Sequence, residues 1–218
     1  NFDNMVKWFV EEFIDQEVGL VIKTSIMSNS IIDWQHLQIK MKELLSSYGD
    51  RKCSVSLLHG DLTPGQMTWL YQHDKIKNMV NIAHGEGFGL PMFEASREKL
   101  PVTTIGWSGQ LDFLQHNGKE YFNKVDYTMQ PIQKEAHWQG VLEADSMWAY
   151  AEQGSYKMAL RKAYKKHDEM LKLAEGAQDI VDSKFRDEVL FKTFVDNILG
   201  FDSSMIDSGE EEAVLEFE

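Results

Sequence analysis

The sequence predicts an α/β protein with a parallel sheet, helices that flank the sheet and additional helices toward the C-terminal end. From residue 2 to residue 105, short apolar β-branched runs alternate with segments whose apolar residues recur at the three-and-four spacing of a helix. From residue 154 to residue 199 the spacing is helical only. Strands that are separated by helices favour a parallel sheet with right-handed crossovers, and we expect such strands to be buried on both faces.

The individual elements follow from the same periodicity. The first helix is expected at residues 2–15, where the apolar residues Phe2, Met5, Val6, Phe9, Val10 and Phe13 recur at helical spacing. Further helices are expected at residues 33–47, at residues 64–73 and from Pro91 onward. Strands are expected at residues 18–24, 53–58, 78–82 and 101–105.

The second half of the chain is less regular. Residues 115–150 are rich in Tyr, Trp and His and have no clear period. The helical stretch from 154 to 199 is expected to break near Gly176. Its first part is expected to present one face that contains Ala159, Ala163, Tyr164, His167, Met170, Leu171 and Ala174.

Length and charge indicate the domain organisation. The 218 residues are sufficient for one domain, which we place at residues 1–200. The formal net charge is −13, and the segment from 202 to 218 holds seven carboxylates and no basic residue. We therefore expect an acidic, flexible tail at residues 201–218. The negative charge argues against binding to a nucleic-acid backbone, because the phosphates would be repelled.

Composition favours a soluble protein of the cytoplasm. Hydrophobic residues make up 43% of the chain, and the single cysteine, Cys53, permits no intrachain disulfide. No apolar run approaches the roughly 18 residues that cross a bilayer, so we expect no transmembrane segment. The seven histidines show no metal-ligand spacing such as H-E-x-x-H, and neither a metal nor a cofactor is expected.

The segment from His84 to Ser96, HGEGFGLPMFEAS, carries the strongest chemical signal. It follows a predicted strand, contains three glycines within five residues and enters a helix through Pro91. Backbone N–H groups and the positive end of a helix dipole converge at such a junction, so a phosphate is the expected ligand. The segment is not a P-loop, and Leu90 stands where the dinucleotide fingerprint requires glycine.

Two carboxylates accompany the glycine loop, Glu86 within it and Glu94 one turn into the helix. Carboxylates beside a phosphate are electrostatically costly, so their presence suggests that they accept hydrogen bonds from neutral hydroxyls, as a sugar would supply. A structural alternative stays open from the residues alone. In that alternative Glu94 complements the helix dipole and Glu86 is a solvated loop residue.

The segments GEGFGLPMFEA and LPVTTIGWSGQLDFL resemble the E-x7-E region of the retaining GT-B glycosyltransferases of family 4 (group 1). HGDLTPGQMTWLY resembles the glycine turn and helix that precede this region, and NFDNMVKWFVEEF resembles the first helix of the nucleotide-sugar-binding half. The resemblance covers residues 1–115, and DYTMQPI and DSMWAY are more similar to phage or viral members. It implies the Rossmann-like C-terminal half of a GT-B fold.

The resemblance also implies roles for individual residues. Glu86 would be the catalytic residue that faces a hydroxyl of the transferred sugar, and Glu94 would hold the ribose hydroxyls of the donor. The backbone of residues 88–90 would cradle the diphosphate, and residues 60–62 would line the nucleobase. The implied donor-binding residues besides Glu94 are Gly60, Asp61, Leu62, Gly87, Phe88, Gly89 and Leu90.

Two further positions, Lys23 and Trp107, are ambiguous. Lys23 ends a predicted strand at the edge where open α/β sheets bind ligands, so it could pair with a donor phosphate or be an ordinary surface lysine. Trp107, Ser108 and Gly109 belong to the loop that approaches the donor in the family, but Trp107 is equally compatible with the core.

The sequence departs from the family in two respects. The Arg and Lys that neutralise the donor diphosphate are not found, and the acceptor-binding half with its catalytic residues is expected upstream of Asn1. The resemblance therefore implies metal-independent transfer of a hexose from a nucleotide sugar to an unknown acceptor with retention, and an isolated chain that binds donor without transfer. The alternatives are a catalytically silent nucleotide-binding or interaction module, and an epimerase or phosphorylase on the same scaffold.

Overall fold

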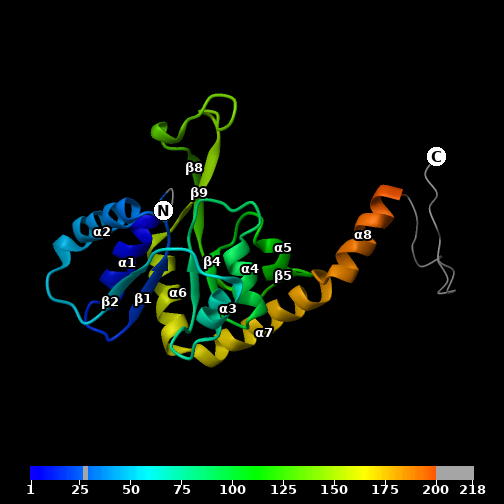
Figure 1. Ribbon diagram of the computed structural model, residues 1–218, viewed down its shortest axis with the longest axis horizontal. Helices are drawn as coiled ribbons and strands as arrows, with labels where there is room; N and C mark the ends of the chain where they lie inside the picture. Colours follow the sequence, from blue (N-terminus) through cyan, green and yellow to red (C-terminus); the bar gives the residue numbers. More distant parts are fainter. Residues whose placement is uncertain (27–28, 200–218) are drawn as a thin grey trace.

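The computed structural model describes residues 1–26 and 29–199, and the protein has the predicted α/β fold (Figure 1). The predicted acidic tail at 201–218 lies outside the described residues. The helices are α1 (Phe2–Phe13), α2 (Ile31–Leu45), α3 (Pro64–Gln72), α4 (Leu90–Arg97), α5 (Leu111–Leu114), α6 (Gln153–Lys165), α7 (His167–Lys184) and α8 (Asp187–Leu199), with 3-10 turns η1 (Ser46–Tyr48) and η2 (Lys134–Ala136). The strands are β1 (Gly19–Lys23), β2 (Ser54–Leu58), β3 (Met79–Asn81), β4 (Val102–Ile105), β5 (Gln115–His116), β6 (Lys119–Glu120), β7 (Asn123–Val125), β8 (Tyr127–Pro131) and β9 (Met147–Ala151).

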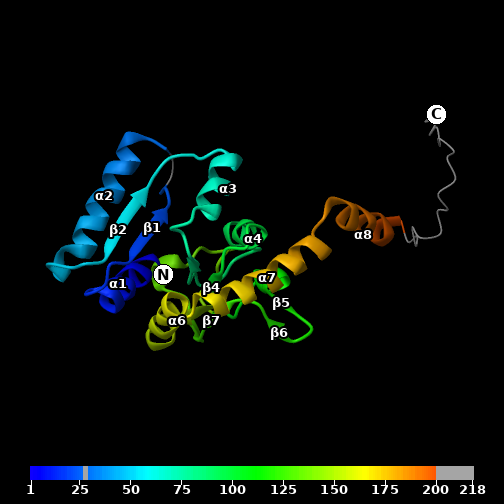
Figure 2. The ribbon, with the colours of Figure 1, turned by 90° about the horizontal axis from the view of Figure 1, so that it is seen from below.

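The parallel strands lie in two small sheets. β1 pairs with β2, and the second sheet has the order β3-β4-β7. The four strands predicted from the apolar runs are all present, so the predicted parallel strands flanked by helices are confirmed, in an arrangement compatible with a Rossmann-like fold. α1 and α2 lie beside β1 and β2, whereas α4, α6 and α7 surround the second sheet (Figure 2).

The two sheets differ in burial. All four residues of β4 are buried, whereas β1 has one buried residue, Ile22, and β2 has none. The expectation of strands buried on both faces is therefore correct for β4 and wrong for β1 and β2. The reason is that α1 and α2 cover one face: Ile22 packs with Val6 and Met41, while Val21 is 44% exposed.

Two apolar clusters fill the rest of the core. One joins α1 to α6 through Phe9, Phe13 and Tyr156. The other gathers α4, α5 and α7 around Met92 and Phe113, both fully buried. α4 therefore rests on a packed apolar base, which fixes the position of its N-terminal end.

The C-terminal helices break at two places, neither of them the one predicted. α7 continues through Gly176; one break lies at Lys166, whose φ of −127° and ψ of 47° are not helical, and the other lies between Lys184 and Asp187. A Cβ atom at Gly176 would overlap the ring of Tyr121, so this glycine permits close packing and does not end the helix. The break at Lys166 changes the helix phase, which leaves Tyr164 and Leu171 of the predicted apolar face 53% and 38% exposed.

Residues 115–150, which lack a clear period, form the short antiparallel pair β5–β6 and the antiparallel hairpin β8–β9. The hairpin projects from the body of the protein, and α8 extends away from it on another side (Figure 1). Among the helices that the structure describes, none is long and apolar enough to cross a membrane.

Candidate functional site

The glycine loop, residues 85–89, connects β3 to α4. The carbonyl oxygen of Gly89 accepts hydrogen bonds from the N–H groups of Met92 (2.9 Å) and Phe93 (3.0 Å), and these bonds start the helix. Gly89 has a φ of 88°, in the left-handed region that favours glycine. Within residues 1–26 and 29–199, no acceptor occupies the N–H groups of residues 87–90. These donors at a helix N-terminus remain available to an anion.

The side chain of Phe88 attaches the glycine loop to the core. Its ring centroid lies 5.1 Å from that of Phe113 and 5.2 Å from that of Phe93. Leu90, in contrast, is 62% exposed. Because the Phe88 ring is engaged in the core, the loop can offer its backbone to a ligand while its position stays fixed.

The loop that follows β4 braces the glycine loop. The hydroxyl of Ser108 donates to the carbonyl of Glu86 at 2.6 Å and accepts from the N–H of the same residue at 3.0 Å. The N–H of Gly109 donates to the same carbonyl at 3.0 Å, and a Cβ atom at Gly109 would overlap the carbonyl of Gly87. Trp107 is 39% exposed, so its alternative assignment to the core is wrong.

The carboxylate of Glu86 is held by a neutral donor. The side-chain amide of Asn81, the last residue of β3, donates to Oε1 of Glu86 at 2.7 Å. The amide oxygen of Asn81 in turn accepts from the N–H of Ala83 at 2.7 Å, which fixes the orientation of the amide. Within the part of the chain that the structure describes, no basic group lies within 4.0 Å of the Glu86 carboxylate. The carboxyl group of Glu86 therefore has a defined orientation without a basic partner among the described residues.

The second carboxylate, Glu94, lies at a pocket of about 240 Å³ between α3 and α4. The pocket combines an apolar wall with three charged side chains, and its lining consists of Leu62, Pro64, Met67, Thr68, Tyr71, Glu94, Arg97 and Glu98. Two residues that the sequence assigned to different parts of the donor site, Leu62 and Glu94, thus lie at one cavity.

Two further contacts shape this pocket. The hydroxyl of Tyr71 donates to Oε2 of Glu94 at 3.2 Å. The amide of the next residue, Gln72, donates to Oε2 of Glu98 at 2.6 Å. The pocket wall on α3 is therefore tied to α4 by two hydrogen bonds. Arg97 adds a cation beside two carboxylates, a mixture that suits a ligand with both hydroxyls and acceptor atoms.

Three further predicted residues, Lys23, Gly60 and Asp61, do not line the pocket. Lys23 ends β1 opposite Leu58, the last residue of β2, and among the described residues no carboxylate lies within 4.0 Å of its ammonium group. Gly60, with a φ of 103°, and the exposed Asp61 follow β2 and lead to Leu62. Lys23, Gly60 and Asp61 therefore share the carboxyl edge of the β1–β2 sheet.

A buried ionisable pair that the sequence pattern did not reveal supports this edge. Nε2 of His59 lies 2.9 Å from Oδ2 of Asp33, and both side chains are less than 10% exposed. The N–H of Ile26 donates to the same oxygen at 3.0 Å. The pair joins α2, through Asp33, to the loop after β2, and the N–H of Ile26 adds the loop after β1, so these contacts fix the start of the segment that carries Leu62.

His84, which precedes the glycine loop, packs on the β8–β9 hairpin. Its ring is stacked on that of Trp148, with centroids 4.9 Å apart, and Nδ1 lies 2.8 Å from the carbonyl oxygen of Ala149. Since a carbonyl only accepts, Nδ1 carries the proton in this contact. Burial lowers the pKa of His84 and outweighs the hydrogen bond to Ala149, which raises it. These contacts give His84 a structural role beside the loop.

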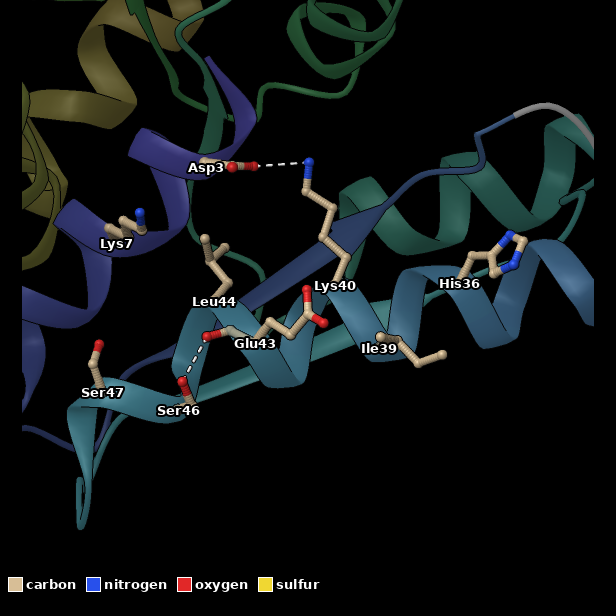
Figure 3. A pocket seen from close by; sticks show the side chains of 9 residues that line it. All are labelled: Asp3, Lys7, His36, Ile39, Lys40, Glu43, Leu44, Ser46 and Ser47. Atoms are coloured by element: carbon tan, nitrogen blue, oxygen red, sulfur yellow. Dashed lines mark hydrogen bonds and ion pairs between the residues drawn. The ribbon is translucent and has the colours of Figure 1, made fainter.

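A larger hollow of about 610 Å³ lies between α1 and α2 (Figure 3). The ammonium group of Lys40 pairs with the carboxylate of Asp3 at 2.9 Å, which joins the two helices. None of the residues predicted for the donor site lines this hollow. Its size alone therefore does not make it the functional site, and the glycine loop and the Glu94 pocket remain the chemically organised region.

Within the described residues, no group of three or more His, Cys, Asp or Glu side chains is arranged to hold a metal ion. No protein-family model and no curated protein matches this chain. The chemistry of the site must therefore be argued from its geometry: free N–H donors at a helix N-terminus, a carboxylate held by Asn81, and a second carboxylate in a pocket with Tyr71 and Leu62.

Proposed function

We propose that this chain is a donor-binding domain of a retaining GT-B glycosyltransferase, which binds a nucleotide sugar whose hexose is transferred to an acceptor. The observation that carries the proposal is the pocket that Glu94 and Leu62 both line. Glu94 belongs to α4, and the glycine loop leads into the N-terminus of the same helix. A nucleoside diphosphate has the matching sequence of groups: a flat base, a diol and a charged diphosphate.

Each group of the donor has a candidate partner. The free N–H groups of residues 87–90 and the positive end of the α4 dipole would bind the diphosphate. Glu94 would accept hydrogen bonds from the ribose hydroxyls, and Leu62 would contact the base. Lys23 would approach the phosphates from the carboxyl edge of β1, because its ammonium group has no carboxylate within 4.0 Å among the described residues.

In this proposal, the chain contributes to catalysis by positioning and by electrostatics. Glu86, oriented by Asn81, would accept a hydrogen bond from a hydroxyl of the transferred sugar. The helix N-terminus and the backbone N–H groups would stabilise the negative charge that develops on the leaving diphosphate. We propose that this binding needs no metal ion and that the activity belongs to the cytoplasm, a reducing compartment that suits the buried free thiol of Cys53.

Calorimetric titration with UDP, GDP and ADP tests the proposal. At least one of them should bind, and Glu94→Ala should weaken its binding by about 10- to 100-fold, because a hydrogen bond to a charged group contributes roughly 1.5 to 3 kcal/mol. Glu43→Ala on α2 removes a carboxylate outside this pocket and should leave affinity unchanged. EDTA should alter affinity by less than about twofold. Absence of binding at millimolar concentration, or full binding by the Glu94 variant, would contradict the proposal.

A further inference from the structure

Tyr71 occupies an unusual position at the Glu94 pocket. It lies on α3, it is 7% exposed, and it belongs to the apolar cluster that also contains Met92 and Ala95 of α4. Tyr71 nevertheless lines the pocket, and its hydroxyl donates to Oε2 of Glu94. Because the ring is enclosed by the core, the direction of the hydroxyl is fixed by packing and not by the ligand.

The hydroxyl is the one donor that holds the Glu94 carboxylate among the residues that the structure describes. No cation lies within 4.0 Å of the Glu94 carboxylate in residues 1–26 and 29–199. Burial, followed by the nearby charge of Glu94, raises the pKa of Tyr71 above its ordinary value, so the hydroxyl keeps its proton at physiological pH. Tyr71 therefore orients Glu94 without neutralising it, and Oε1 remains open to a ligand hydroxyl.

We propose that Tyr71 is a positioning residue that sets the preference of this pocket for ribose over 2′-deoxyribose. The inference rests on the proposed function, in which Glu94 accepts hydrogen bonds from the donor ribose. The adjacent 2′- and 3′-hydroxyls can both bond one carboxylate only when its plane has a suitable orientation. A 2′-deoxyribose needs a single carboxylate oxygen, so its binding depends less on that orientation.

The distance from the Tyr71 hydroxyl to Oε2 of Glu94, 3.2 Å, is long for a hydroxyl donor. Such contacts often tighten when a ligand completes the site. Oε2 still has a free lone-pair direction after accepting from Tyr71, so both carboxylate oxygens can take part in binding the diol. The phenol, fixed by packing, and the carboxylate that it orients thus form a pair in which Tyr71 sets the geometry and Glu94 makes the contact.

The test compares each ribonucleoside diphosphate with its 2′-deoxy counterpart: UDP with dUDP, GDP with dGDP, and ADP with dADP. For the pair that binds best, Tyr71→Phe should weaken binding of the ribonucleotide by about 3- to 10-fold and binding of the deoxynucleotide by less than about twofold. The ratio of the two affinities should therefore fall. The Phe ring preserves the apolar packing of α3 on α4. Tyr48→Phe is the matched control, because it removes a 3.1 Å hydrogen bond from a tyrosine to Glu11 far from this pocket.

A double-mutant cycle shows whether Tyr71 acts through Glu94. In a Glu94→Ala background, Tyr71→Phe should no longer change the affinity ratio, because its target is gone. An equal loss for both sugars, an unchanged ratio in Tyr71→Phe, or an effect that persists without Glu94 would overturn the inference while leaving the proposed function intact. If the unmodified chain binds none of the six nucleotides, the proposed function itself fails.

Discussion

The side-chain amide of Asn81 donates a 2.7 Å hydrogen bond to the carboxylate of Glu86, across the turn that joins β3 to the glycine loop. Ser108 and Gly109 hold the backbone of the same glutamate from the other side. Strand β3 therefore orients the side chain of Glu86, and the loop after β4 fixes its main chain. A residue secured by two separate elements is suited to an orienting role at a ligand.

Asn81→Ala should reduce the affinity for nucleotide sugars by about 3- to 10-fold and leave the affinity for the corresponding nucleoside diphosphates unchanged. The reason is that Glu86 is proposed to contact the sugar, whereas Glu94 and the loop backbone are proposed to bind the nucleotide. Calorimetry with UDP-glucose against UDP, and with GDP-mannose against GDP, measures this difference.

Asn78→Ala is the control for that prediction, since Asn78 lies at the other end of β3 and accepts a hydrogen bond from Thr103. Asn78→Ala should affect folding stability, but it should not create a difference between the affinity for nucleotide sugars and the affinity for nucleoside diphosphates. An equal loss of affinity for sugar-linked and sugar-free nucleotides in Asn81→Ala would assign Asn81 to the general integrity of the loop. The sugar-facing role of Glu86 would then lose its support.

The sequence was sufficient to locate strands β1 to β4, the glycine loop and the two glutamates, because each depends on a local pattern. The run of glycines followed by Pro91 specifies a strand, loop and helix without reference to distant residues. Leu62 and Glu94 were both expected at the donor, and they do line one pocket. The partners of the glutamates were not predicted, because Tyr71 is 23 positions from Glu94 and its spacing is typical of a core residue.

Two features of the fold also depend on tertiary contacts. β1 and β2 have apolar runs like that of β4, but helices cover only one of their faces, and this burial cannot be inferred from composition. The β8–β9 hairpin is rich in aromatic residues that contact other elements, such as Trp148 on His84, and its strands show no clean alternation in the sequence.

Stability should decrease below about pH 6.5 partly because of His84. Burial lowers the pKa of His84 in the folded state, so the unfolded chain takes up the proton first as the pH falls through the ordinary histidine value of about 6.5. The contribution of His84 is fully present above that value and is lost as the pH falls toward the folded pKa. His84→Phe should therefore give a flatter dependence of the free energy of unfolding on pH between about 5 and 7.

Urea unfolding at several pH values measures that dependence. His36→Ala removes an exposed histidine from α2 and should leave the profile of the unmodified protein in place. A His84→Phe profile as steep as that of the unmodified protein would show that other groups account for the acid sensitivity. The variant keeps an aromatic ring against Trp148, so a loss of stability at every pH would instead report the missing hydrogen bond to Ala149.

Gly176→Ala separates helix propensity from packing in α7. Propensity alone predicts a gain of about 1 kcal/mol, because glycine is the less favourable residue in a helix interior. The added Cβ, however, would overlap the edge of the Tyr121 ring at Cδ1 and Cε1, so the whole ring would have to shift. Overpacking of this kind costs roughly 1 to 3 kcal/mol, so we expect a net destabilisation and a lower melting temperature.

Gly154→Ala near the start of α6 is the control, since no atom lies within 4 Å of its added Cβ, and it should be neutral or stabilising. If Gly176→Ala raised the melting temperature as much as Gly154→Ala, the close contact between α7 and Tyr121 would not contribute to the packing of the second cluster.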